Sequence, residues 1–413
     1  MSKPEFDVIV WGATGFTGQL VVEYLAQTYG VDSDLRWAIA GRNRDKLESV
    51  RHACLPEAQH QKLGIVVADS NDAASLASMV GRANVICSTV GPYARYGTPL
   101  VEACSAAGTH YCDLTGEVPW MMRVIDQYQQ AAEASGARIV HTCGFDSVPF
   151  DLGTWRVQQI MYERHGVYAQ QVKGRTGPTR GAFSGGTVAS IINMLEEARE
   201  DPSIMQDSAD PYALYPDGIP PGEDGPDQTK AVYDPDFKRW TSPFMMAAIN
   251  TKVVRRSNAL LGFPWGKGFL YDEATLNNSR WKASLASVAG GIGMVSLAMG
   301  PTRNLLQRVL PKPGEGPTRE QREAGFYEVY FLGIDPSDRT HDTAIQVSGT
   351  LDPGYGSTAR MIAEAAVCLA QDELAAGGGF WTPAAAMGEP YLNRLTEKAG
   401  IAFDEVDPRS LQP

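Results

Sequence analysis

Cysteine and histidine are both scarce in this sequence. Its 413 residues include six cysteines and six histidines, and the cysteines are too scattered to form a metal-binding or redox motif. They are Cys54, Cys87, Cys104, Cys112, Cys143 and Cys368. We therefore expect free thiols in a reducing compartment, with no disulfide bond and no bound metal.

Positive charge is also in deficit. The chain has 36 lysines and arginines against 48 aspartates and glutamates, which gives a net charge of -12. A molecule of this sign repels the phosphates of nucleic acids. Binding to nucleic acid is therefore not expected.

An export signal and a long apolar run are missing as well. The first residues lead directly into a strand pattern, without the apolar stretch and cleavage site of a signal peptide. Residues 283–302 carry no charge, but they are rich in Ala, Ser and Gly, which makes insertion across a bilayer unfavourable. We expect a cytoplasmic protein.

Strand-like and helix-like segments alternate in the first 150 residues. Apolar runs that predict strands lie at 6–10, 36–40, 65–68, 85–87, 110–112 and 138–141, and helical patterns lie between them, as at 16–29 and 43–53. Such alternation favours a parallel sheet covered by helices on both faces. The sequence thus predicts an α/β fold that begins with a doubly wound parallel sheet.

The turn after the first strand contains three regularly spaced glycines. Residues 10–18 read Val-Trp-Gly-Ala-Thr-Gly-Phe-Thr-Gly. This spacing lets the backbone turn sharply, approach a pyrophosphate and pack the next helix closely on the sheet. The residues predicted to contact a dinucleotide here are Gly12, Thr14, Gly15, Phe16, Thr17 and Gly18.

The ends of the next strands indicate which dinucleotide binds. Arg42 stands where an NAD site usually has a carboxylate, and its guanidinium can pair with the 2′-phosphate of NADP. An exposed arginine at a helix start is the simpler alternative. Asp69 follows the third strand, on the adenine side, and Ser88, Thr89, Val90 and Gly91 follow the fourth, near the nicotinamide. The predicted cofactor is NADP.

Several motifs together resemble one family. Gly-Ala-Thr-Gly-Phe-Thr-Gly at 12–18, Ala-Gly-Arg at 40–42 and Val-Gly-Pro-Tyr at 90–93 are similar to the saccharopine dehydrogenase-like oxidoreductases. So are His-Tyr-Cys-Asp-Leu-Thr-Gly-Glu at 110–117 and Cys-Gly-Phe-Asp-Ser-Val-Pro-Phe-Asp-Leu-Gly at 143–153. The most similar branch includes the bacterial trans-acting enoyl reductases of lipid biosynthesis.

The resemblance implies a domain plan and a type of chemistry. It implies an NADP-binding Rossmann domain at 1–150, a second α+β domain of mixed sheet at 151–350, and a C-terminal segment at 351–413 that returns to the first domain. It also implies reduction by hydride transfer, in the bacterial relatives on a lipid intermediate carried by a partner synthase. The substrate itself is left open.

The proton donor for such a reduction is not marked by a known pair of residues. None of the sixteen tyrosines has a lysine four residues later, so the Tyr-Lys pair of short-chain dehydrogenases is absent. Tyr93, beside the expected nicotinamide site, and Asp146, after the sixth strand, are the candidate catalytic residues. Both have structural alternatives, because a tyrosine can pack in a turn and an aspartate can cap a helix.

Two neighbouring segments in the second half have opposite charge. Residues 200–236 hold ten acidic residues and seven prolines, which predicts an irregular lid, partner-binding loop or surface insertion. Residues 238–312 hold eleven lysines and arginines and two acidic residues. This basic region could contact an anionic membrane, such as the inner face of the plasma membrane, or residues 283–302 could form a homodimer interface or a core helix.

These observations leave three functional hypotheses. The first is an NADP-dependent, enoyl-reductase-like enzyme acting on a lipid-related or other hydrophobic substrate, free or carrier-bound. The second is a saccharopine-type amino-acid dehydrogenase, in which Arg175 and Arg180 would bind substrate carboxylates. The third is a non-catalytic NADP-binding scaffold or sensor at a membrane face.

Overall fold

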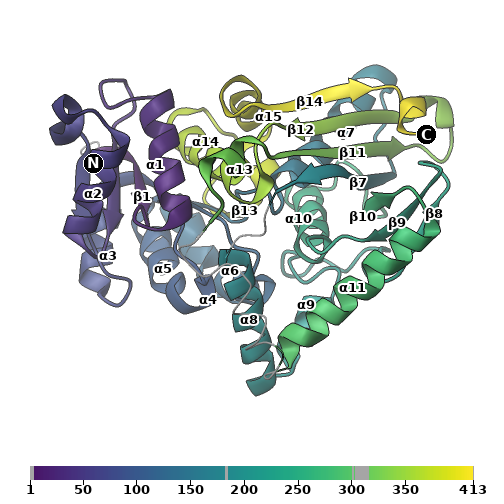
Figure 1. Ribbon diagram of the computed structural model, residues 1–413, viewed down its shortest axis with the longest axis horizontal. Coiled ribbons are helices and arrows are strands. Elements are labelled where there is room, and N and C mark those ends of the chain that lie inside the picture. Colours follow the sequence, from purple (N-terminus) through teal and green to yellow (C-terminus); the bar gives the residue numbers. More distant parts are fainter. Residues whose placement is uncertain (1–3, 182–184, 300–301, 303–315, 413) are drawn as a thin grey trace.

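Two seven-stranded sheets form the framework of the molecule (Figure 1). The structure is a computed structural model that describes residues 4–181, 185–299, 302 and 316–412. No helix in these described ranges is long and apolar enough to cross a membrane.

The first sheet is parallel throughout. In sheet order its strands are β13 (Gly379–Trp381), β6 (Arg138–Val140), β5 (His110–Asp113), β4 (Ala83–Ser88), β1 (Phe6–Trp11), β2 (Trp37–Gly41) and β3 (Gly64–Val67). The helices that follow its N-terminal strands are α1 (Phe16–Thr28), α2 (Arg44–Cys54), α3 (Ala73–Val80), α4 (Tyr93–Tyr96), α5 (Thr98–Ala107) and α6 (Val118–Ser135). The predicted α/β fold with a doubly wound parallel sheet is confirmed.

Both faces of this sheet are buried. Along β1, Val8 and Val10 pack into one core with α1 and α2, whereas Ile9 and Trp11 pack into a second core with α3, α5 and α6. Alternate residues of a strand point to opposite faces, so a strand covered on both sides is apolar along its whole length. This explains why the short apolar runs of the sequence are strands.

The second sheet is mixed, as the resemblance implies. Its strands are, in order, β14 (Ile401–Val406), β12 (Thr343–Gly349), β11 (Phe326–Ile334), β7 (Gln171–Arg180), β10 (Leu270–Asn277), β9 (Arg239–Pro243) and β8 (Val232–Asp234). Only the β7–β10 pair is parallel among these described strands. The helices of this half are α7 (Val148–His165), α8 (Gly185–Glu200), α9 (Ser203–Ala209), α10 (Ala247–Leu260), α11 (Arg280–Ala298), α13 (Arg319–Glu323) and α15 (Pro383–Arg394).

The chain beyond residue 351 contributes to both sheets. Helix α14 (Thr358–Gln371) packs on α1 and on β1, β4 and β5, and β13 then extends the parallel sheet beside β6. Glu364 of α14 accepts hydrogen bonds from the hydroxyls of Tyr24 and Tyr29 at 2.7–2.9 Å. The last strand, β14, pairs with β12 of the mixed sheet, so this segment ties the two halves together.

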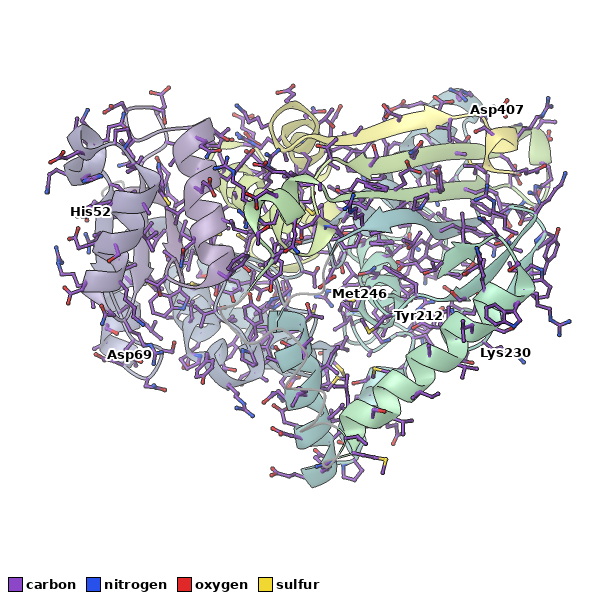
Figure 2. All side chains as sticks on the ribbon, in the orientation of Figure 1. His52, Asp69, Tyr212, Lys230, Met246 and Asp407 are labelled. Atoms are coloured by element: carbon purple, nitrogen blue, oxygen red, sulfur yellow. The ribbon has the colours of Figure 1, made fainter. Side chains whose placement is uncertain are left out.

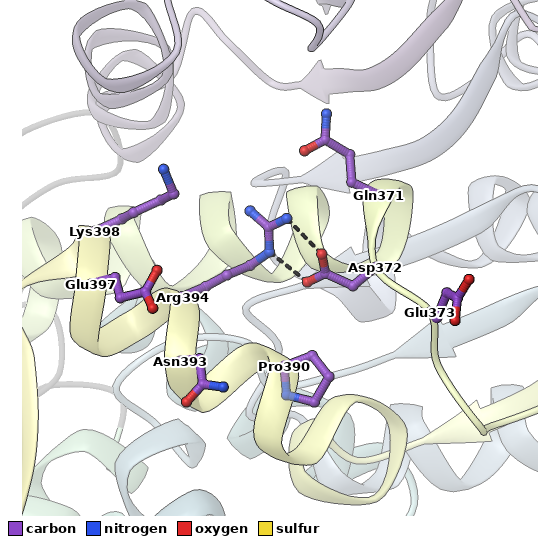
Figure 3. Close-up of a pocket in the computed structure, with 8 residues that line it drawn as sticks. All are labelled: Gln371, Asp372, Glu373, Pro390, Asn393, Arg394, Glu397 and Lys398. Atoms are coloured by element: carbon purple, nitrogen blue, oxygen red, sulfur yellow. Dashed lines mark hydrogen bonds and ion pairs between the residues drawn. The ribbon is translucent and has the colours of Figure 1, made fainter.

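A shallow hollow of about 460 Å³ lies where α14 meets α15 (Figure 3). A bidentate ion pair from Arg394 to Asp372, at 2.5 and 2.7 Å, crosses it, and Arg394 also donates to the hydroxyl of Tyr29. Tyr29 follows the C-terminal end of α1, roughly 20 Å along that helix from its glycine turn. The hollow therefore belongs to the attachment of the C-terminal segment and not to the dinucleotide turn.

The acidic segment at 200–236 and the basic segment at 238–312 contact each other, which the sequence did not predict. The stretch 200–236 contains α9 and β8, and its Asp224 pairs with Arg255 at 2.8 Å. Lys252, Arg255 and Arg256 of α10 are all buried. The expected basic surface is therefore smaller than predicted, because these three cations face inward. Arg303, Arg308 and Lys312 of the predicted basic region lie outside the described residues.

Candidate active site

The turn between β1 and α1 has the geometry of a dinucleotide cradle. Gly12 has a φ of 86°, and a Cβ placed there would stand 2.6 Å from a methyl of Val90. A Cβ on Gly18 would stand 2.1 Å from the carbonyl oxygen of Gly12. The first glycine thus makes the turn, and the third lets α1 approach it closely.

The middle glycine leaves the start of α1 open. Gly15 is exposed, and a Cβ there would meet only the carbonyl oxygen of Gly12, at 3.3 Å. Helix α1 begins after Gly15 without a side-chain cap, so its first N–H groups point their positive ends toward this opening. Such a helix terminus binds a pyrophosphate, and the cradle fits the predicted cofactor.

The other residues predicted for this turn surround the cradle. Thr14 and Thr17 are half-buried, and the carbonyl of Thr14 accepts from the Gln19 side chain at 3.0 Å. Phe16 meets the ring of Tyr355 edge-on at 4.8 Å, and the guanidinium of Arg322 lies 5.7 Å from its centroid. Phe16 therefore also connects α1 to the second half of the chain.

Arg42 and Asp69 lie at the carboxyl ends of β2 and β3. Arg42 is exposed and forms no ion pair with any described residue. Asp69 is half-buried, and its carboxylate accepts from the N–H of Asn71 at 2.9 Å. The structure thus leaves the Arg42 guanidinium available at the adenosine end of the cradle.

The residues after β4 close the other side of the turn. Thr89 donates from its hydroxyl to the carbonyl of Trp11 at 3.1 Å, and Val90 packs against Gly12. Ser88 is buried and Gly91 is exposed. All residues predicted to bind the cofactor therefore meet at one edge, where the carboxyl ends of β1 to β4 lie together.

Tyr93 does not point a free hydroxyl into this edge. Its side chain is 5% exposed, its hydroxyl donates to the carbonyl of Ser88, and the same oxygen accepts from the N–H of Leu114, both at 3.1 Å. Burial raises the pKa of Tyr93 well above its usual value. These contacts give Tyr93 the features of a residue that fixes the loop after β5.

Asp146 lies in the loop between β6 and α7. It is partly exposed, and its carboxylate makes no hydrogen bond to any described residue. Burial raises its pKa to about 6. The next residue, Ser147, has a φ of 117°, which is strained for a side chain with a Cβ, and strain of this kind collects at functional sites. Asp146 therefore has the environment of a general acid.

The loops of Tyr93 and Asp146 are adjacent. Leu114, which is held by the Tyr93 hydroxyl, lies against Gly144, where a Cβ would stand 2.8 Å from a Leu114 methyl. Asp113 anchors the same loop, because its carboxylate accepts from the N–H of Thr142 at 3.2 Å and contacts Nδ1 of His141 at 2.8 Å. The two candidate residues thus belong to one connected structure.

Sequence reasoning missed three buried acids at this site, which are Asp113, Glu117 and Glu273. Glu117 accepts from the N–H groups of Tyr93 and Ala94 at 2.9 Å and from the hydroxyl of Ser190 on α8 at 2.7 Å. Burial raises its pKa. The motif at 110–117 contains both Asp113 and Glu117. Two acids at and just after the end of a predicted strand were the signal in the sequence that could have identified them.

The third buried acid, Glu273 of the mixed sheet, is connected to the Asp146 loop by hydrogen bonds. The hydroxyl of Ser147 donates to the side chain of Asn250 at 3.0 Å, and Asn250 donates to Glu273 of β10 at 3.0 Å. Tyr271 also donates to Glu273, at 2.9 Å. Burial raises the pKa of Glu273 to about 8. The sequence does not predict these hydrogen bonds, because Ser147 is more than 100 residues away from Asn250 and Glu273.

The fold and the cradle define an NADP-dependent oxidoreductase. The family described as the saccharopine dehydrogenase NADP binding domain matches residues 8–140, which span β1 to β6. The predicted cofactor, NADP, is confirmed by this match. The chain therefore has a domain that binds a nicotinamide cofactor for hydride transfer.

Comparison with curated proteins identifies the family. A Mycobacterium leprae trans-acting enoyl reductase is 37% identical over 426 residues, covering 97% of this chain and 98% of that protein. One from Mycobacterium ulcerans is 37% identical over 432 residues, with 96% and 97% covered. A Mycobacterium tuberculosis relative with a provisional name of the same kind is 40% identical over 414 residues, with 97% of each covered. The chain belongs to the trans-acting enoyl reductase family, which confirms the resemblance.

A solved structure supports the same fold. Apo saccharopine dehydrogenase (L-Glu forming) from Saccharomyces cerevisiae aligns with a TM-score of 0.53 at 13% identity, covering 97% of this chain and 99% of that one. At this identity the similarity concerns the fold alone. It confirms the combination of a parallel and a mixed sheet in one chain.

Proposed function

We propose that this protein reduces the carbon–carbon double bond of an enoyl group on a lipid-related substrate, with Asp146 as the proton donor. The observation that carries the proposal is a partly exposed carboxyl group in the loop after β6, at the same edge of the parallel sheet as the NADP cradle and two strands along from β4. It has no hydrogen bond to a described residue, and burial raises its pKa to about 6. The relatives are named for reduction of an enoyl group in trans.

The reaction requires a hydride and a proton. NADPH held by the glycine cradle and Arg42 would supply a hydride for the β carbon of the enoyl group, and the α carbon would take a proton. Asp146 gives up that proton and recovers it from solvent, which it reaches because it is partly exposed. Ser147 and Asn250 hold the loop, and Tyr93 holds Leu114 against it.

Carrier-bound delivery and the cytoplasm complete the proposal. An enzyme that acts in trans receives its enoyl group on another protein, so we propose a carrier-bound lipid as the substrate. A reducing compartment suits the described cysteines, all of which are free thiols.

The saccharopine-type alternative has less support. Arg175, one of the two arginines it would need, is buried and paired with Asp234 at 2.8 Å and with Asp272 at 2.6 Å. Its guanidinium therefore has structural partners already. Arg180 at the end of β7 is exposed. A single arginine would bind a substrate with several carboxylates only weakly.

The test is the Asp146→Asn variant with a long-chain trans-2-enoyl thioester. We expect kcat to fall by about 10²- to 10⁴-fold, the usual contribution of a general acid, while NADPH binds as before. In the wild type the donor must be protonated, so kcat/KM should be highest below pH about 6 and fall above it. The variant should lose this dependence.

The matched control is Asp404→Asn, which changes an exposed aspartate of β14. It should leave both kcat and the pH profile unchanged. Full activity of Asp146→Asn would remove the donor assignment. NADPH binding without turnover of any enoyl substrate by the wild type would favour a sensor instead.

A further inference from the structure

Helix α11 carries a row of large apolar side chains on its outside. It runs along the edge of the molecule from β8 and β9 toward the end of α8 (Figure 1). The row recurs at steps of four, three, four, three and four residues, and each of its side chains is between 52% and 71% exposed. Its members are Trp281, Leu285, Val288, Ile292, Val295 and Met299.

This row points directly away from the protein. Ala283, on the opposite side of the helix, is buried where α11 packs on β9. Side chains three and four residues apart lie on one face, so the six apolar residues share a single outward face. Figure 2 shows side chains projecting from α11 along its outer edge. Within the described residues nothing covers them.

The width of the row indicates what kind of partner it fits. Small or hydroxylated residues such as Ser284, Ala289 and Gly291 flank it, and there is no charge between Lys282 and Met299. A helix that lies on a membrane surface typically has a broad apolar face and a polar face rich in lysine and arginine. A narrow row with steps of three and four is instead typical of a seam between two helices.

The spacing of the row is the same in both directions. We propose that α11 is a homodimer interface, in which it pairs antiparallel with α11 of a second copy of this chain. In that arrangement Trp281 meets Met299, Leu285 meets Val295, and Val288 meets Ile292 across a two-fold axis. A two-fold interface must be complementary to itself, and this palindromic spacing satisfies the requirement.

Charge favours the antiparallel direction. Arg280 and Lys282 are exposed at the N-terminal end of α11, and the other end of α11 contacts α8, whose C-terminal end carries the exposed Glu200 and Asp201. Antiparallel pairing places the two cations beside these carboxylates and beside the negative end of the other helix dipole. Parallel pairing would place the cations of the two copies side by side.

Neighbouring residues enlarge the surface. Val232 and Tyr233 of β8 are 42% and 48% exposed, and β8 contacts α11. A stable interface removes about 800 Å² of surface from each partner, more than one narrow row is expected to provide. The apolar end of β8 supplies further area near Trp281. The proposed dimer interface is formed by α11 and β8 and is independent of the reductase reaction.

Sedimentation of the full chain tests the proposal. The wild type should sediment with twice the chain mass at micromolar concentration. Ile292→Glu should raise the dimer dissociation constant by about 100-fold or more, because two unpaired carboxylates would be buried in the seam. The control Tyr162→Glu, at a site on α7 that is 49% exposed against 62% for Ile292, should remain a dimer.

Cross-linking tests the direction of the helices. A mixture of Val288→Cys and Ile292→Cys chains should form a disulfide between the two variants, and each variant alone should form much less. The wild type measures the background from natural cysteines, of which only Cys54 is not buried. Cross-linking of each variant with itself alone would contradict the antiparallel arrangement.

Two further outcomes would overturn the proposal. One is a wild-type monomer at all concentrations, and the other is a dimer that Ile292→Glu leaves intact. If a monomeric wild type floats with phosphatidylcholine vesicles and Ile292→Glu does not, a membrane is the occupant of this face. Circular dichroism of each variant establishes that it is folded.

Discussion

At the scale of single residues, the three glycines of the cradle have different tasks. Gly12 adopts a positive φ, Gly18 allows a close approach of helix to turn, and Gly15 leaves space where the pyrophosphate is expected. Arg42 is exposed at the adenosine end and forms no ion pair with the described part of the chain. Substitutions at these positions should therefore separate stability, cofactor affinity and cofactor choice.

Changing Gly15 and Gly18 should separate affinity from stability. Gly18→Ala places a methyl 2.1 Å from a backbone oxygen, so we expect unfolding to become easier by about 1–3 kcal/mol. Gly15→Ala places one 3.3 Å from the same oxygen, so stability should change little while NADPH affinity falls about tenfold. Urea unfolding and NADPH fluorescence titration measure the two effects. Unaltered NADPH binding by Gly15→Ala would contradict the cradle.

Arg42→Ala should change the preference between the two nicotinamide cofactors. An ion pair with the 2′-phosphate contributes about 1.5–3 kcal/mol, so the preference for NADPH over NADH should fall by about 10- to 100-fold. Arg44→Ala is the control, since Arg44 is two residues away and has only a loose contact with Glu48, at 3.9 Å. An unchanged preference in Arg42→Ala would show that another residue selects NADP.

At the scale of elements, buried acids join the helices of the second half to one another and to the Asp146 loop. Asp151 of α7 accepts from Ser257 of α10 at 2.5 Å and from the N–H of Ala384 of α15 at 2.8 Å, and burial raises its pKa to about 7. Glu273 of β10 reaches the Asp146 loop through Asn250 and Ser147. These contacts make the position of the Asp146 loop depend on the mixed sheet.

The buried Glu273 predicts how stability depends on pH. Its pKa is about 8 in the folded chain against an ordinary value of 4.5, so between these values the folded chain keeps a proton that the unfolded chain has lost. The free energy of unfolding should therefore fall as pH rises through this window. In Glu273→Gln, the free energy of unfolding should fall less steeply between pH 6 and 8 than in the wild type. The part of the fall that remains comes from Asp151, whose pKa is also raised.

Chemical denaturation at several pH values checks this. The control is Glu163→Gln, which changes an exposed glutamate of α7 and should leave the slope unaltered. If the free energy of unfolding changed with pH as steeply in Glu273→Gln as in the wild type, Glu273 would have to be ionised in the folded chain at neutral pH.

The elements of the parallel sheet were predictable because their signals are local. A strand buried on both faces is apolar throughout, and three glycines after β1 mark the cradle directly. The three-residue β13 carries no such signal, because only its pairing with β6, far away in the sequence, makes it a strand. The inward direction of Lys252, Arg255 and Arg256 was equally hidden, since their partners lie in the acidic stretch and on other elements.

At the scale of the whole molecule, the candidate cofactor-binding and catalytic residues lie along one edge of the parallel sheet. The carboxyl ends of β1 to β6 bring together the cradle, Arg42, the loop of Tyr93 and the loop of Asp146, which come from residues 12–147. The C-terminal segment completes both sheets, and α11 presents its apolar row on a different side. The molecule thus separates the reaction from the surface proposed for self-association.

Transfer of deuterium shows directly whether this protein reduces an enoyl group with NADPH. NADPH labelled at C4 with deuterium, as each stereoisomer in turn, is incubated with the enzyme and a long-chain trans-2-enoyl thioester. We expect one of the two isomers to yield a saturated product heavier by one mass unit, with the deuterium on the β carbon. Tight NADPH binding with no deuterium in any enoyl-derived product would contradict the proposed reduction.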